Sequence, residues 1–173
     1  QESSVYSESK RMSEILANAY HKEHGIDFII YRLSTIYGAC KNPTRTAFFE
    51  FLNNAKKGLD INVREKFGPK RDNLYIKDAI NGILYAALKG ENTNAYNISS
   101  GGKLNNFLSV GEIAMIIAEV ANKKLHKKNL VNVKFTNETF FRSRGYILNN
   151  GKLTSLGWKV SFEYKEAIKE IIF

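Results

Sequence analysis

The opening segment of the chain combines an amphipathic helical pattern with a continuous apolar run. Over residues 7–24 the apolar side chains recur with the three- to four-residue spacing of a helical face. Gly25 follows the last polar turn, which is typical of a helix C-terminus. Residues 28–31 are all apolar or aromatic, as in a strand that is covered on both faces. A helix, a glycine and a buried strand form half of a βαβ unit, so the pattern predicts a parallel sheet.

Short strands and helices are predicted to alternate over the rest of the chain. The expected strands lie at 61–63, 74–76, 96–98 and 131–135. The expected helices lie at 46–57, 79–89, 153–158 and 162–172, and one more begins at a capping box formed by Ser109 and Glu112. Asp78 is the predicted N-cap of the helix over 79–89, because a carboxylate can accept a hydrogen bond from the first backbone N–H groups.

The composition is that of a folded protein in a reducing compartment. Of the 173 residues, 43% are hydrophobic, which is enough to offset the entropy of ordering the chain. No stretch approaches the roughly 20 apolar residues of a membrane-spanning helix. Cys40 is the single cysteine, which excludes an internal disulfide, and the three histidines have no zinc-site spacing. We therefore expect a cytoplasmic protein with neither a metal site nor a membrane partner.

The net charge of +9 leaves a second function class open. Lys and Arg number 26 against 17 Asp and Glu, and an excess of cations is typical of proteins that neutralise nucleic-acid phosphates. The cations are scattered, however, except for the lysines within residues 123–128. This distribution favours a solvated basic surface, and we expect no nucleic acid as a partner. A basic nucleic-acid-binding module without catalysis stays as the alternative.

Tyr6 and Lys10 are the residues most suggestive of catalysis. Their spacing of four puts both side chains on one face of the predicted helix. A phenol is a poor acid or base at neutral pH, but an adjacent ammonium favours its phenolate form. Such a pair can exchange a proton with a substrate hydroxyl. The same spacing also occurs in ordinary surface helices. The surrounding sequence therefore has to distinguish a catalytic pair from a surface helix.

That context consists of five sequence blocks, which lie at 6–14, 31–38, 70–78, 96–101 and 152–158. Taken together and in this order, they resemble the extended short-chain dehydrogenase/reductases, specifically the NAD-dependent nucleotide-sugar epimerase/dehydratase family. The resemblance implies an α/β fold, namely the C-terminal part of a Rossmann-like doubly wound parallel sheet with a small mixed α/β substrate-binding lobe. Residues 1–38 would end the dinucleotide-binding domain. Residues 39–173 would form mostly the substrate-binding lobe, and one option is that 78–98 returns to the main sheet.

The resemblance also assigns roles to the cofactor side of the site. Tyr6 would be the catalytic acid/base and Lys10 would steady its phenolate, and both would contact the nicotinamide ribose of NAD or NADP. Ser34 would lie at the cofactor. The strand that contains Arg32 would pass beside the nicotinamide and the sugar. The helix with Tyr6 and Lys10 would also pack against its copy in a homodimer.

On the substrate side, the resemblance implies a nucleotide-diphosphate sugar held by Thr35, Tyr37, Arg71 and Arg144. Relatives usually have Asn where Thr35 stands, and Thr35 lacks the amide donor. The two arginines would grip the diphosphate, since a guanidinium fork suits two phosphate oxygens. The expected chemistry is transient oxidation of the sugar to a C4 keto intermediate, followed by epimerisation, dehydration or decarboxylation.

Two family features are absent from the sequence. No Gly-x-x-Gly-x-x-Gly motif occurs, although its backbone N–H groups are what hold the cofactor pyrophosphate. The Ser or Thr that relatives carry upstream of the catalytic tyrosine is also absent. We therefore expect the chain to be the C-terminal half of a longer enzyme, and expect this half alone to be inactive. A purely structural fragment of such an enzyme is a third interpretation.

Overall fold

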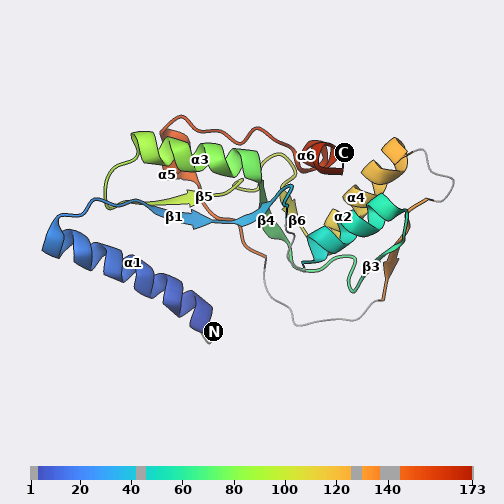
Figure 1. The fold of residues 1–173 in the computed structure, drawn as a ribbon, viewed down its shortest axis with the longest axis horizontal. Coiled ribbons are helices and arrows are strands. Elements are labelled where there is room, and N and C mark those ends of the chain that lie inside the picture. Colours follow the sequence, from blue (N-terminus) through green and yellow to red (C-terminus); the bar gives the residue numbers. More distant parts are fainter. Residues whose placement is uncertain (1–3, 42–45, 126–129, 137–144, 173) are drawn as a thin grey trace.

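The computed structural model describes residues 4–41, 46–125, 130–136 and 145–172. The helices along the chain are α1 (Val5–His24), α2 (Ala47–Lys57), α3 (Ile76–Lys89), α4 (Val110–Leu125), α5 (Gly151–Ser155) and α6 (Tyr164–Ile172). The strands are β1 (Ile30–Leu33), β2 (Thr35–Tyr37), β3 (Ile61–Val63), β4 (Arg71–Tyr75), β5 (Ala95–Ile98), β6 (Phe107–Leu108) and β7 (Val133–Phe135). Figure 1 shows their arrangement. The predicted α/β class is confirmed.

Most of the strand pairing is parallel. β1 pairs with β5, with Ile30 opposite Ala95 and Leu33 opposite Ile98. β4 is the central strand of a second group, in which β2 is parallel and β6 antiparallel to it. β3 and β7 form a third, parallel pair. Parallel pairing between strands that lie far apart in sequence requires crossover connections, which the intervening helices provide.

The buried apolar side chains of the described residues form two hydrophobic cores. The first, here called the α4/α6 core, joins α2, α4 and α6 to β3 and includes Ile61, Ile117 and Ile168. The second, the α3/α5 core, lies under α3 and β5 and includes Leu74 and Trp158. β4 contributes to both cores, because neighbouring side chains of a strand point to opposite faces.

Helix α1 stands apart from both cores. Its N-cap is Ser4, whose hydroxyl accepts a hydrogen bond from the backbone N–H of Ser7, and Gly25 ends the helix at φ 67°. No residue of α1 is buried, and the apolar side chains of Met12, Ile15 and Leu16 remain about half exposed. Figure 1 shows the helix extending away from β1 and β5, with the chain's N-terminus at its far end.

The predicted N-cap at Asp78 is wrong. Helix α3 starts three residues earlier than predicted, at Ile76, directly after β4, and its N-cap is Tyr75. The Asp78 carboxylate is fully buried and accepts hydrogen bonds from the backbone N–H groups of Ser161 and Phe162, at 3.0–3.2 Å. The aspartate that suggested an N-cap therefore makes a long-range contact. A local sequence pattern cannot distinguish such a residue from an N-cap.

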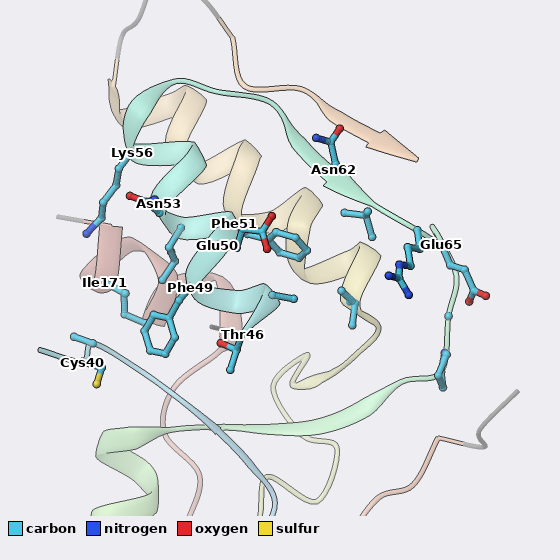
Figure 2. Close-up of a pocket in the computed structure, with 18 residues that line it drawn as sticks. Cys40, Thr46, Phe49, Glu50, Phe51, Asn53, Lys56, Asn62, Glu65 and Ile171 are labelled. Atoms are coloured by element: carbon cyan, nitrogen blue, oxygen red, sulfur yellow. The ribbon is translucent and has the colours of Figure 1, made fainter. Parts of the chain in front are cut away.

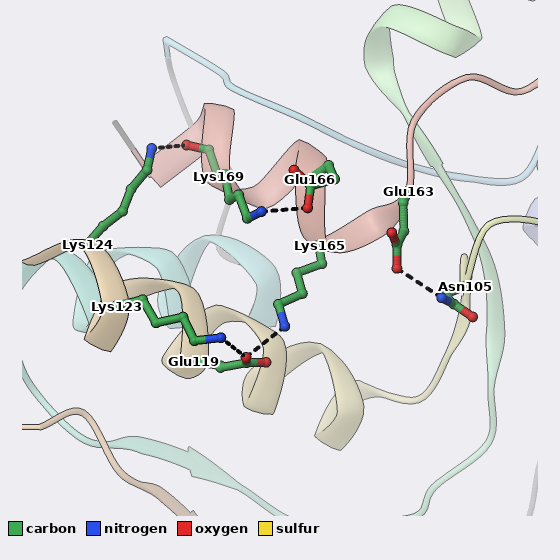
Figure 3. A network of polar contacts seen from close by, with 8 residues as sticks. All are labelled: Asn105, Glu119, Lys123, Lys124, Glu163, Lys165, Glu166 and Lys169. Carbon is green, nitrogen blue, oxygen red and sulfur yellow. Dashed lines mark hydrogen bonds and ion pairs between the residues drawn. The ribbon is translucent and has the colours of Figure 1, made fainter.

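A polar network joins α4 to α6 on the surface of the α4/α6 core (Figure 3). Glu119 of α4 accepts hydrogen bonds from Lys123 of the same helix and Lys165 of α6, both at 2.7 Å. These two ammonium groups lower the pKa of Glu119 from 4.5 to about 2. Its side chain is 42% exposed, so solvent screens much of the interaction.

We predict that this network makes stability depend on acid pH. Because the pKa of Glu119 is lower in the folded state, its contribution is present above pH ~4.5 and is lost as the pH falls towards about 2. Glu119→Gln should therefore reduce the difference in unfolding free energy between pH 7 and pH 3, measured by urea denaturation. Glu23→Gln, at an exposed position of α1, is the control, and an equal reduction in both variants would contradict the prediction.

Among the described residues, none of the helices is long and apolar enough to cross a membrane.

Candidate functional site

Tyr6 and Lys10 lie side by side in the first turns of α1. The Lys10 ammonium sits over the Tyr6 ring, with Nζ 5.5 Å from the ring centroid. Tyr6 is 71% exposed, so its hydroxyl can be reached from solvent. The two side chains meet because helical side chains lean towards the N-terminus, which directs Lys10 back to the residue four positions earlier. The structure therefore brings together the two residues predicted to catalyse; their role stays a prediction.

The same face of α1 is bonded to β1 one turn further on. The Arg32 guanidinium donates to both carboxylate oxygens of Glu14, from Nε at 2.8 Å and from Nη2 at 2.6 Å. Hydrogen bonding to Arg32 lowers the pKa of Glu14, and the same contact raises the pKa of Arg32. Arg32 was expected beside the nicotinamide and the sugar, and the structure shows it hydrogen-bonded to α1.

The predicted cofactor and substrate residues that follow Arg32 lie in different surroundings. Ser34 connects β1 to β2, and its hydroxyl is buried without a hydrogen-bond partner among the described residues. Thr35 is exposed. Tyr37 is 5% exposed, and its ring packs on Tyr164 with a centroid distance of 4.3 Å. Burial raises the pKa of Tyr37 well above its ordinary value, so this phenol stays neutral and contact with a sugar would require the aromatic packing to open.

Arg71 begins β4 and is half-buried. Its guanidinium stacks on the Tyr146 ring, with Cζ 5.1 Å from the centroid, and the two residues also form a parallel bridge. Neighbouring Asp72 is buried and accepts hydrogen bonds from the backbone N–H and the hydroxyl of Ser100. Arg144, the second predicted phosphate ligand, lies outside the described residues.

A cavity of about 1160 Å³ lies beside α2 and β3 (Figure 2). Its walls combine an apolar surface, which includes Phe49 and Ile171, with the side chains of Asn62 and of two cations, Lys56 and Arg64. Aromatic and amide groups can pack against and hydrogen-bond a planar base, and cations suit a phosphate. The apolar and cationic side chains of the cavity thus suit a nucleotide, although its walls also include two carboxylates, Glu50 and Glu65.

Sequence reasoning did not identify the residues of this cavity. None of Tyr6, Lys10, Ser34, Thr35, Tyr37 or Arg71 lines it. The cavity does adjoin two of the five blocks, because Ala39 and Cys40 follow the block at 31–38 and Pro69 precedes the block at 70–78. Because Arg71 follows Pro69 by two residues, the Cα atoms of the two residues lie within about 7 Å of each other. The sequence feature that could have indicated the cavity is the group of polar residues around the strand at 61–63. This segment contains no family motif.

Tyr6 and Lys10 fit part of a dinucleotide cofactor. Tyr6 and Lys10 present a hydroxyl and an ammonium on an exposed face, which suits the hydroxyls of a ribose. No group of three or more His, Cys, Asp or Glu residues able to hold a metal occurs in the part of the chain that the structure describes.

Comparison with known proteins identifies relatives of one kind. Residues 1–99 match the model of the NAD dependent epimerase/dehydratase family. An uncharacterised protein of Methanocaldococcus jannaschii is 31% identical over 96% of this chain and 48% of its own length. A dTDP-glucose 4,6-dehydratase of Actinoplanes is 27% identical over 98% of this chain and 50% of its own length. The chain thus spans about half the length of these relatives.

A solved structure supports the fold. The UDP-glucose 4-epimerase of Thermus thermophilus, solved in complex with NAD, superposes with a TM-score of 0.77 at 21% identity. The match covers 99% of this chain and 54% of the epimerase. The predicted Rossmann-like fold is confirmed. The division into residues 1–38 and 39–173 stays a prediction.

Proposed function

This chain belongs to the NAD dependent epimerase/dehydratase family, and we propose that it is the C-terminal portion of an enzyme that transforms a nucleoside-diphosphate sugar. The observation that carries the proposal is the contact between Lys10 and Tyr6 on an exposed helical face. An exposed phenol beside an ammonium is suited to take a proton from a sugar hydroxyl and to return it.

The exposed apolar surfaces support the proposal of a longer enzyme. Besides the apolar residues of α1, helix α3 exposes Ile80, Leu84 and Leu88, which recur every fourth residue along one side. Leu88 is 82% exposed. β1 pairs only with β5 among the described strands, so its second edge is open to a further parallel strand. Exposed helical faces on α1 and α3 around an open strand edge suit a continuation of the sheet.

The cofactor is proposed to be NAD or NADP, bound beside α1. A bound cofactor would supply reversible hydride transfer at the sugar carbon that is oxidised, which we propose to be C4. Tyr6 would take up or return the proton of the C4 hydroxyl, while Lys10 would stabilise the anionic form of Tyr6. The same helix is proposed to pack against its copy in a homodimer.

The nucleotide is proposed to occupy the cavity beside α2 and β3. Phe49 would contact the base, and Arg64 would face the phosphates together with Arg71. Arg144 is the proposed second diphosphate ligand. Among the described residues, six lysines form ion pairs with carboxylates, including Lys70 with Glu112 and Lys77 with Glu170. This pairing disfavours the alternative of a basic surface for nucleic acid.

Ligand-induced thermal stabilisation tests the substrate class. UDP-glucose or dTDP-glucose at about a hundred times Kd should stabilise the chain by about 2.7 kcal/mol, roughly 5–10 °C in Tm. Arg64→Ala should abolish most of this shift, whereas Lys22→Ala, on the exposed surface of α1, should not. Binding of poly(U) that weakens steeply with salt, without stabilisation by either nucleotide sugar, would contradict the proposal.

A further inference from the structure

Three side chains follow one another along a single face of α1. Tyr6, Lys10 and Glu14 are spaced by four residues, so each lies one helical turn from the next. Lys10 therefore has two possible neighbours. The Tyr6 ring lies one turn towards the N-terminus, and the Glu14 carboxylate lies one turn towards the C-terminus.

These two neighbours compete for the same ammonium. A lysine followed four residues later by a glutamate forms a helical ion pair, in the weaker of the two possible orders, and this pair competes with an exposed contact between an ammonium and an aromatic ring. An ammonium drawn towards Glu14 would leave Tyr6, and a carboxylate beside it would offset its positive charge. In the structure, the Lys10 ammonium lies over Tyr6.

The Glu14 carboxylate is engaged elsewhere. Arg32 donates to both of its oxygens, at 2.8 and 2.6 Å, in the two-pronged geometry that a guanidinium forms with a carboxylate. We propose that Arg32 is a positioning residue that sequesters Glu14 and thereby keeps the Lys10 ammonium at Tyr6. The inference rests on the proposed roles of Tyr6 and Lys10, and adds a residue that acts on them through Glu14.

The surroundings of α1 support this assignment. No residue of the helix is buried, so apolar packing does not fix these side chains. The carboxylate stays charged at neutral pH, since the hydrogen bond to Arg32 lowers the pKa of Glu14. A guanidinium occupies two oxygens at once, which the point charge of a lysine does not. Arg32 also lies two and three residues before Ser34 and Thr35, so the contact ties the helix to the strand that leads towards them.

NMR spectroscopy of the intact 173-residue chain, with ¹³C-labelled lysine, tests the proposal. The ε-protons of Lys10 should show a nuclear Overhauser effect to the Tyr6 ring and an upfield ring-current shift. Tyr6→Ala provides the reference without a ring, and Lys10→Arg assigns the signal. In Arg32→Gln, Glu14 is released, and we expect the Overhauser effect to fall measurably, by up to about half.

The double variant separates positioning from a purely structural role. In Arg32→Gln with Glu14→Gln, no carboxylate competes for Lys10, so the signal should return to that of the unaltered chain. An unchanged signal in Arg32→Gln would overturn the proposal. A double variant whose signal equals that of Arg32→Gln would overturn it as well, because the contact between Arg32 and Glu14 would then act only by holding α1 in place. Both readouts concern geometry, so they stand whether or not Tyr6 proves to be catalytic.

Discussion

Replacement of Tyr6 by phenylalanine in the full-length enzyme proposed above is expected to lower turnover by about 10²–10⁴-fold. The change removes one hydroxyl and keeps the ring on which Lys10 sits. A loss of this size corresponds to about 3–5 kcal/mol of transition-state stabilisation. The measurement is kcat with a UDP- or dTDP-sugar, together with the Kd of the same sugar nucleotide.

Tyr20→Phe is the matched control, since Tyr20 lies on the same helix and is also exposed. It should leave turnover unchanged. The Kd should change little in either variant, because the proposed nucleotide cavity lies beside α2 and β3 and does not include Tyr6. Retained turnover in Tyr6→Phe would remove the phenol from its proposed role, and a large rise in Kd would indicate that it binds substrate.

The elements that the sequence predicted well are those set by local rules. Gly25 ends α1 in the left-handed conformation, as the sequence indicated. The capping box is also present, because the backbone N–H of Ser109 donates to Glu112 while the backbone N–H of Glu112 donates to Ser109. The strand at 61–63 was placed correctly. In each case the information lies within a few neighbouring residues.

Other features depend on residues that are distant in the chain. β4 begins at Arg71, earlier than predicted, because its polar first residues pair with β6 and β2. Burial of Tyr37 depends on Tyr164, more than a hundred residues later. The cavity beside α2 and β3 likewise combines residues from several elements, including Ile171 near the C-terminus. The periodicity of apolar residues and short sequence motifs do not predict contacts between residues that are distant in the chain.

The family pattern supplied what periodicity could not. Tyr6 and Lys10 became candidates only because five blocks occur in a fixed order. The pattern did not reveal the state of each side chain. Arg32 belongs to one of these blocks, yet only the structure shows that it bonds to Glu14. Sequence order thus indicated the site, and tertiary geometry determines which of its residues can act.

Asp78 is the position where loss of one side chain should cost the most stability relative to its size. It lies in the first turn of α3, which packs on the α3/α5 core, and it binds the segment at 161–162 that leads into α6 of the α4/α6 core. The carboxylate thereby joins the two cores. It is fully buried, so no water can replace it as an acceptor without a change of structure.

Asp78→Ala should lower the free energy of unfolding by about 2–5 kcal/mol, since it leaves the N–H groups of Ser161 and Phe162 without their buried acceptor. Asp78→Asn keeps one acceptor oxygen and should lose less. Urea denaturation at pH 7 measures both, and Asp27→Ala, at an exposed position, should change stability by no more than about 0.5 kcal/mol. If Asp78→Ala proved as mild as Asp27→Ala, the segment at 161–162 would have to be held by its apolar neighbours, and the two cores would not depend on this carboxylate.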